Sequence, residues 1–269
     1  RAQRARRRSR LRLQPPFVQS GPDTHKGHMD PAARDKDKLE AEMLYALERF
    51  FQDQRLRVRE ALYERVPDDR KGIQLPLPFW NDEGRKLLSV LLPFLQRGAE
   101  GGVETQRAII DIEVDWTQPF TEAADWARKH AGTLIRGITD TTRERVRSVV
   151  GNWIESTDHT FPDLWKQLME DHAFSRSRAQ MIAATESTRA YAEGEMVGAE
   201  VLEKEGWYEY DKRWDTARDD RVCPICAPMD GVVVHGVRAK FDTLAGALEG
   251  PPAHPRCRCG MSMVPVIPK

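Results

Sequence analysis

The chain has 269 residues, enough for one or two domains with a buried core. Hydrophobic residues make up 40% of it and charged residues 31%, and no apolar run approaches the roughly 20 residues of a membrane-spanning helix, which argues against a membrane protein. The formal net charge is zero, but residues 1–28 hold seven Arg and Lys26 against Asp23, so residues 29–269 carry a net charge of −7.

Residues 1–28 are set apart by this charge. They are expected to be a basic disordered tail or the remnant of a tag or a processed piece. The segment RAQRARRRSRLR could bind nucleic-acid phosphates, and a solvated chain end is the simpler interpretation. No apolar leader segment precedes the body of the chain, so the four cysteines are expected to be reduced.

Residues 29–104 are predicted to form a helical N-terminal arm. Apolar residues at helical spacing predict one long amphipathic helix over residues 31–66, and its length suits packing against a second long helix or a partner. A short helix is expected from Asn81 to Leu95. The glycines of the following segment, RGAEGG, are expected to break the chain at a domain boundary.

Residues 105–205 are predicted to form a helical body. One helix follows from the apolar stripe over residues 120–135, and a second is expected to begin at a capping box made by Thr141 and Glu144. A short helix is expected around residues 164–169. The last long helix covers SRAQMIAATESTRAYAEGEMVGAEVLEKEG.

Glu186 lies on the apolar stripe of that last helix. A carboxylate at a core-facing position is costly unless it is paired, so Glu186 is expected to meet an Arg or a Lys from another helix or from the C-terminal module. With no second acid nearby in the sequence, this residue is expected to be structural rather than catalytic.

The pattern changes beyond Gly206. Aromatic residues gather in WYEYDKRW, Asp230-Gly231 is a turn signal, the valines after it favour a strand, and CGMSMVPV alternates. Residues 206–269 are therefore predicted to be a small β-rich module. The fold class is α+β: a mainly α-helical body with a small β-rich C-terminal module that zinc is expected to brace.

The zinc prediction comes from the cysteine spacing. Cys223 and Cys226 share a two-residue gap with His254 and Cys257, so one tight turn in each pair could direct both side chains at one point. These four residues are the predicted metal ligands, with Zn²⁺ as a structural cofactor. Cys259 is the spare, and a site of four cysteines that uses it in place of His254 is the second choice.

Other uses of these residues are less well supported. The cysteines could be reduced thiols without a metal, and none of the seven His has the Glu two residues on that zinc deaminases require. CPIC leads into a turn rather than a helix, unlike a thioredoxin-type site, and a nucleophilic Cys257 with His254 as its base would need a geometry rarely reached by sequence neighbours. Asp219, Asp220 and Asp230 could hold a divalent cation, but turn formation is their expected use.

Three segments in order, RAQMIAATESTRAYAEG, RWDTARDDRVCPICAPMDGVVV and GPPAHPRCRCG, resemble the Mu F-like head morphogenesis family of tailed phages. The resemblance covers about residues 105–266, and residues 1–104 are not explained by it. The doubled Asp of WDTARDD leaves open which of the two fills the family's position. The matching positions are Ile182, Ala183, Thr185 and Glu186; Trp214, Thr216 and Ala217; Asp219 or Asp220, Arg221, Cys223 and Cys226; and His254, Cys257, Arg258 and Cys259.

The resemblance implies a structural minor capsid protein that acts in head morphogenesis near the portal. Its expected partners are the portal and other capsid proteins, with contact to packaged DNA. No membrane, no small-molecule substrate and no catalysed reaction are expected. Its expected location is the interior of the phage head in the virion, and the host cytoplasm during assembly.

Two other classes of function stay open. The first is a zinc-knuckle module that binds nucleic acid independently of a capsid, although the net charge of −7 on residues 29–269 should repel phosphate. The second is an enzyme, with site residues among Asp219, Asp220, Glu186 and His254. No phosphate-binding or hydrolase motif supports it, and the sequence therefore favours a protein that is not an enzyme.

Overall fold

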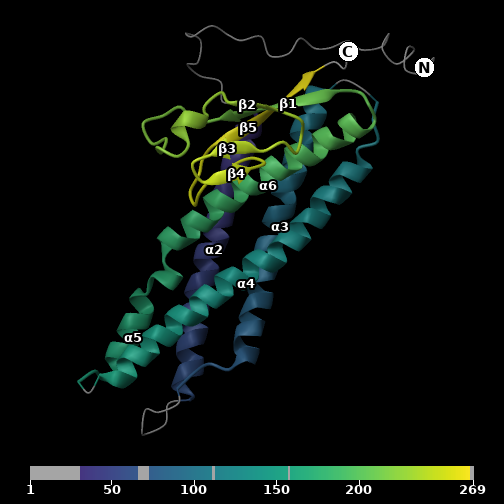
Figure 1. The fold of residues 1–269 in the computed structure, drawn as a ribbon. Helices are drawn as coiled ribbons and strands as arrows, with labels where there is room; N and C mark the ends of the chain where they lie inside the picture. Colours follow the sequence, from purple (N-terminus) through teal and green to yellow (C-terminus); the bar gives the residue numbers. More distant parts are fainter. Residues whose placement is uncertain (1–30, 66–72, 111–112, 157, 267–269) are drawn as a thin grey trace, which may run out of the picture.

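The structure is a computed structural model that describes residues 31–65, 73–110, 113–156 and 158–266, so the basic tail over residues 1–28 lies outside the described residues. Long helices form an elongated body, and a small β module lies at one end of it (Figure 1). This arrangement confirms the predicted α+β class. The elements are α2 (Pro31–Tyr63), α3 (Leu77–Ile109), α4 (Thr117–Glu155), α5 (Phe161–Glu170), the 3-10 helix η1 (His172–Phe174), α6 (Arg176–Lys204), β1 (Glu209–Asp215), the 3-10 helix η2 (Ala227–Met229), β2 (Val233–His235), β3 (Phe241–Thr243), β4 (Gly246–Leu248) and β5 (Gly260–Val266).

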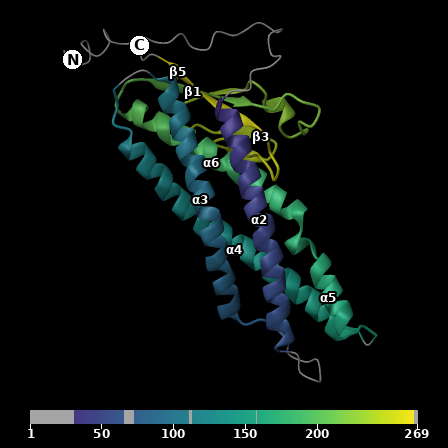
Figure 2. The same cartoon turned by 180° about the vertical axis from the view of Figure 1, so that it is seen from behind.

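The helices form two layers. α2 and α3 make one layer, and α4, α5 and α6 make the other, as the views from the two sides show (Figures 1 and 2). The core between the layers takes residues from every helix of the body, including Leu47 of α2, Leu91 of α3, Trp153 of α4 and Ile182 of α6. The outer faces of α2 and α4 therefore point to solvent on opposite sides of the body.

The predictions for α2, α5 and α6 are confirmed within a few residues at each end. Local signals explain where these helices begin. Thr160 and Asp163 form a capping box at the start of α5, and the Ser175 side chain accepts the Arg178 backbone N–H at the start of α6.

The prediction of a short helix from Asn81 to Leu95 is wrong. α3 begins at Leu77, directly after Pro76, and Asn81 lies inside it. Pro78 lacks a backbone N–H, and the first turn of a helix has no hydrogen-bond partner for that group, so proline is favourable there. This explains why α3 begins before Asn81. The helix then continues to Ile109 through all three glycines of RGAEGG.

The glycines are there because α3 and α6 lie almost backbone to backbone. A Cβ atom added at Gly102 would lie 2.3 Å from the Tyr191 carbonyl oxygen, and one added at Gly194 would lie 1.9 Å from the Ala99 carbonyl oxygen. Only glycine allows this approach. The chain break expected at RGAEGG is therefore a helix contact instead.

The prediction that two helices divide the segment before residue 155 is also wrong. α4 is one helix of 39 residues, and Thr141, the expected N-cap, lies in its interior. Its hydroxyl donates to the Gly137 carbonyl at 2.8 Å, one turn back in the same helix. Because Ile138 and Val146 continue one buried face across this point, packing keeps the helix intact.

The β module contains an antiparallel sheet in the order β2-β1-β5 and a separate β3-β4 hairpin. The strands expected from the valines and from CGMSMVPV are β2 and β5, and Trp214 of β1 pairs with Met261 of β5. The core of the module is made mainly of aromatic and sulfur-containing side chains, with Val237 as a buried aliphatic member, and it packs on Met196 and Leu202 of α6. α6 thus contributes side chains both to the core between the helix layers and to the core of the β module.

In the part of the chain that the structure describes, no helix combines the length and the apolar character that crossing a membrane requires.

Candidate metal centre

Two tight turns bring the predicted ligands together. In the first, the backbone N–H of Cys226 donates to the Cys223 carbonyl at 3.0 Å, and in the second, the N–H of Cys257 donates to the His254 carbonyl at 3.1 Å. Each turn therefore places its first and fourth side chains on the same side. The equal spacing of the two pairs in the sequence corresponds to the same backbone hydrogen bond, although only the second turn contains a residue with a left-handed φ, Arg256.

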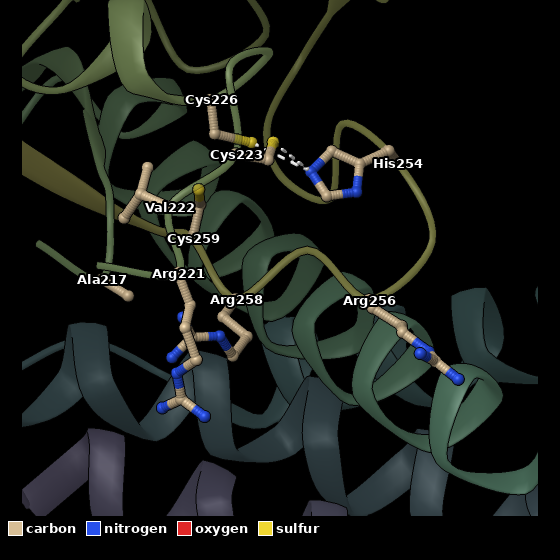
Figure 3. Close-up of a pocket in the computed structure, with 9 residues that line it drawn as sticks. All are labelled: Ala217, Arg221, Val222, Cys223, Cys226, His254, Arg256, Arg258 and Cys259. Carbon is tan, nitrogen blue, oxygen red and sulfur yellow. Dashed lines mark hydrogen bonds between the residues drawn. The ribbon is translucent and has the colours of Figure 1, made fainter. Parts of the chain in front are cut away.

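The donor atoms of the two turns meet (Figure 3). His254 Nε2 lies 2.9 Å from the Cys223 sulfur and 3.3 Å from the Cys226 sulfur, and the sulfurs of Cys226 and Cys257 are 3.8 Å apart. Cys223, Cys226 and His254 form one group of ligand atoms within 4.8 Å of one another, and Cys226, Cys257 and Cys259 form another. Cys226 belongs to both groups and so lies at the centre of the cluster.

The cluster has room for one ion. A cavity of about 30 Å³ is lined by Cys223, Cys226, His254 and Cys259, with the side chains of three arginines at its rim (Figure 3). A zinc ion held by thiolates at about 2.3 Å places the sulfurs of a tetrahedron about 3.8 Å apart. The separation between Cys226 and Cys257 matches that value, but His254 Nε2 lies nearer to the Cys223 sulfur than two ligands of one zinc ion would. Cys257 is grouped with Cys226 and Cys259 and not with Cys223 and His254, so the four predicted ligands do not form one group.

A hydrogen bond fixes the protonation of His254. Its Nδ1 lies 2.8 Å from the Pro255 carbonyl oxygen, which only accepts, so Nδ1 carries the proton and donates. When the ring is neutral, Nε2 has a lone pair that faces Cys223 and Cys226. A backbone carbonyl on the far nitrogen is the usual partner of a metal-binding histidine, and it supports the prediction of His254 as a ligand.

The environment favours a negative charge on this cluster. The hydrogen bond from Cys259, with backbone N–H groups beside it, lowers the pKa of Cys257 to about 5. Burial, together with the neighbouring Cys257, raises the pKa of Cys226 to about 12. The pKa of Cys223 is lowered as well, so a negative charge is favoured on both Cys257 and Cys223, and a thiolate is the form that binds a metal.

The second turn rests directly on α6. The backbone N–H of Arg256 donates to the Thr185 hydroxyl at 2.9 Å, the Thr188 hydroxyl donates to the Cys257 carbonyl at 3.3 Å, and the Arg256 guanidinium donates to the Ser177 carbonyl at 3.0 Å. These contacts also hold Arg256 at a φ of 65°, a left-handed conformation that is unfavourable for a residue with a side chain. The centre is thus fixed to the helical body.

The acidic residues near the cysteines have structural partners. Asp219 accepts two hydrogen bonds from the Arg258 guanidinium, at 2.7 and 2.8 Å, which holds the pKa of Asp219 well below its usual range. It also accepts the Arg221 backbone N–H, while Asp230 accepts the backbone N–H of Thr216. The expected role in turns is confirmed, and Asp219 is the member of the doubled pair that makes these contacts.

Glu186 is paired as expected, but with a different residue. Its carboxylate lies 2.6 Å from Nε2 of His130 on α4, and the His130 ring stacks on Trp126 with the ring centroids 4.8 Å apart. Arg189 of its own helix is farther away, at 3.6 Å. The prediction of an Arg or a Lys from another element is therefore wrong, because histidine supplies the pair.

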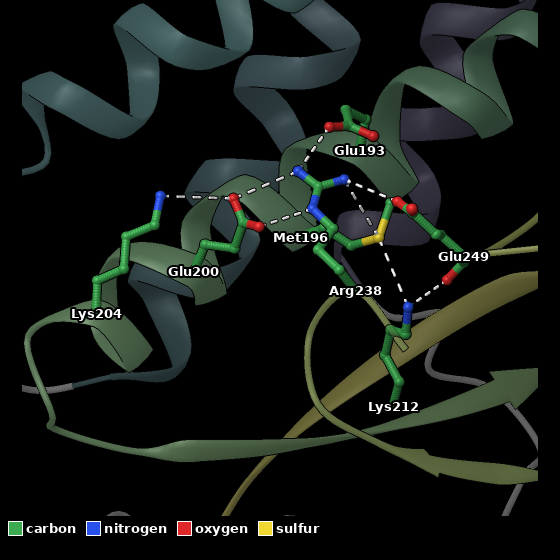
Figure 4. A network of polar contacts seen from close by, with 7 residues as sticks. All are labelled: Glu193, Met196, Glu200, Lys204, Lys212, Arg238 and Glu249. Carbon is green, nitrogen blue, oxygen red and sulfur yellow. Dashed lines mark hydrogen bonds and ion pairs between the residues drawn. The ribbon is translucent and has the colours of Figure 1, made fainter. Parts of the chain in front are cut away.

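A polar network that the sequence did not indicate joins the module to α6 (Figure 4). The Arg238 guanidinium donates to Glu193 at 2.9 Å and Glu200 at 2.8 Å, both on α6, and to Glu249 at 3.3 Å. The ammonium group of the fully buried Lys212 donates to the Glu249 carbonyl. Since Glu249 begins the segment that leads to His254, the network fixes the start of the second turn.

Residues 154–262 match the family model described as Phage Mu protein F like protein. No curated protein and no solved structure gives a significant match. The matched segment contains α5, α6, both turns and the sheet as far as β5. The resemblance found in the three sequence motifs is thus confirmed over residues 154–262, which are similar to this family.

Proposed function

From this Mu F-like region, we propose that the chain is a structural minor head protein of a tailed phage that acts in head morphogenesis near the portal. Its partners are the portal and other capsid proteins. It resides inside the head in the virion, after assembly in the host cytoplasm. The observation that carries the proposal is that the family segment includes both the metal centre and the helix on which the centre rests.

The metal centre serves stability in this proposal. Cys223, Cys226, His254 and Cys257 would hold a structural zinc ion, which would join the two turns and so connect the end of the chain to the first part of the module. A small module with a core of sulfur and aromatic side chains gains more from such a link than a large domain would. No reaction is proposed for this site.

Contact with packaged DNA is part of the same proposal. A zinc-knuckle module that acts on nucleic acid alone is the alternative, but the arginines at the centre do not favour it. Arg258 is paired with Asp219, and Arg256 donates to Ser177. The charge of Arg258 is therefore neutralised within the fold and Arg256 uses donors there, while the side chain of Arg221 stays 74% exposed.

The test is quantitative mass spectrometry of purified procapsids and mature particles, with the copies of this chain counted against the subunits of the portal ring. A few copies in each particle are expected. The chain's absence from both particles would refute the head role and favour the nucleic-acid alternative.

A further inference from the structure

The donor residues of the cysteine cluster divide into two groups that share one sulfur. Cys223, Cys226 and His254 make the first group, and Cys226, Cys257 and Cys259 make the second. Within each group, the donor atoms lie within 4.8 Å of one another. The second group, which we call the thiol trio, offers an ion sulfur alone.

His254 interacts with Cys223 and is not a member of the thiol trio. Its Nε2 lies 2.9 Å from the Cys223 sulfur, within hydrogen-bond distance. In a tetrahedral site with metal bonds of about 2.0 Å to nitrogen and about 2.3 Å to sulfur, the two atoms would lie about 3.5 Å apart. The first group must therefore open before it can hold an ion.

The spacing and burial of the thiol trio suit three bonds to one ion. The sulfurs of Cys226 and Cys257 are 3.8 Å apart, and three sulfurs around one ion lie about 4.0 Å apart when each bond is about 2.3 Å. All three residues are buried, with Cys259 the most exposed at 4%. The cavity of about 30 Å³ is lined by Cys226 and Cys259, so an ion has a way in (Figure 3). A site this enclosed favours an ion that needs no water ligand.

A buried N–H group beside the thiol trio favours a negative charge there. Trp214 is fully buried, and its indole Nε1–H has no acceptor in hydrogen-bond geometry within the described ranges. The indole lies next to Cys259, where it favours a negative charge on that sulfur. A bound cation displaces the protons of the thiols, so the N–H would then face a charged acceptor. Metal binding would thus relieve the cost of an unpaired buried donor.

We propose that the thiol trio binds Cu(I), a soft monovalent ion, in a three-coordinate site that uses neither Cys223 nor His254. Thiolates select Cu(I) and zinc among the common ions, and a structural zinc ion requires four protein ligands whereas Cu(I) is satisfied by three. Because Cys226 belongs to the first turn and Cys257 to the second, the ion would still join the two turns. This inference uses the cluster alone and rests neither on zinc nor on the head role.

The test titrates Cu(I) into the full chain, without oxygen and with a thiol-free reductant, against a chromogenic Cu(I) chelator. One ion per chain is expected, and X-ray absorption should show sulfur neighbours and no nitrogen. Cys259→Ser should weaken binding by about 100-fold or more, because it leaves two thiolates of the trio. Cys223→Ser is the matched control: it also leaves three of the four cysteines, but it keeps the trio and should change the affinity by less than about threefold. Trp214→Phe should weaken binding by about tenfold.

A double variant separates the two ions. Cys223→Ser with His254→Ala should keep Cu(I) and lose zinc, and Cys259→Ser should do the reverse, with circular dichroism showing that the helices persist in each. Loss of zinc binding in every protein, including the wild type, would refute the zinc site and leave this inference standing. A nitrogen neighbour of the copper, equal losses of Cu(I) in Cys259→Ser and Cys223→Ser, or no one-to-one complex would overturn the proposal.

Discussion

At the scale of single residues, the orientation of His254 bears on which residues would bind the metal. The sequence spacing allows either His254 or Cys259 as the fourth ligand, because residues 257 and 259 share one side of an extended chain. The Pro255 carbonyl favours His254 by holding a proton on Nδ1, whereas Cys259 rather than Cys257 lines the cavity, so both ligand sets stay predictions. A backbone carbonyl has no signature in the sequence, which is why spacing alone left two ligand sets open.

The first prediction concerns these ligands. The purified chain should bind one zinc ion, and Cys223→Ser, Cys226→Ser, His254→Ala and Cys257→Ser should each lose it, since each removes a donor from a tetrahedral site. Cys259→Ser should keep the metal. Elemental analysis and the absorption spectrum of the cobalt-substituted protein measure this. Retention by His254→Ala together with loss by Cys259→Ser would instead establish the site of four cysteines.

Lys212 supplies a prediction about pH. Burial lowers the pKa of Lys212 to about 8 from 10.5, so between these values the unfolded chain binds a proton that the folded chain does not. Stability from this residue therefore increases as pH rises through that window. Lys212→Met removes the effect.

The measurement is urea unfolding of both proteins between pH 7 and 10.5. The free energy of unfolding of the wild type, relative to that of Lys212→Met, should increase as pH rises above about 8, whatever the difference between the two proteins is at pH 7. A difference that is constant across the window would mean that Lys212 keeps an ordinary pKa in the fold.

At the scale of elements, the helices that the sequence misjudged are those where packing overrides a local signal. Thr141 has the spacing of a capping box, and RGAEGG has the composition of a break, yet both lie within continuous helices. Apolar periodicity was the better guide to the interior of α6, and the N-caps that the structure shows, Thr160 and Ser175, lie where the periodic pattern starts. A local signal predicts a boundary only where the buried stripe ends.

The glycines at the contact between α3 and α6 lead to the third prediction. Gly194→Ala should destabilise the chain by about 1–3 kcal/mol, because the methyl group has no space against the Ala99 carbonyl of α3. Gly137→Ala on α4 is the matched control, since nothing lies within 4 Å of its added Cβ atom. That change should instead stabilise by about 0.5–1 kcal/mol.

Chemical denaturation of both variants measures these changes in the free energy of unfolding. Equal effects of Gly194→Ala and Gly137→Ala would show that α3 and α6 can move apart at no cost. The glycines would then have no packing role.

At the scale of the whole molecule, the order of features along the chain was predictable and their mutual contacts were not. A helical body followed by a β module appears in the change from helical to alternating patterns near Gly206. The sharing of α6 between the two cores depends on side chains far apart in the sequence, such as Arg238 with Glu193 and Glu200. Nothing in the local sequence marks such pairs, so the module looked more independent than it is.

That sharing determines what removal of the metal should do. The core of the module rests on the C-terminal half of α6, and the second turn rests on Thr185 and Thr188, whereas α2 and α3 contribute to the core between the helix layers. A chelator, or His254→Ala, should therefore loosen residues 207–266 while the layers of the body persist. Among the helices of the body, only α6 is expected to loosen, because it contributes side chains to the core of the module as well as to the core between the layers.

Hydrogen exchange with and without chelator measures this response segment by segment. Faster exchange is expected first in the two turns and in β5, then in the part of α6 that faces the module, with the centres of α2 and α3 unchanged. Cys259→Ser, which should keep the metal, is the control for the loss of a thiol. Unchanged exchange and protease resistance over residues 207–266 would mean that the polar network around Arg238 and the aromatic core hold the module without a metal.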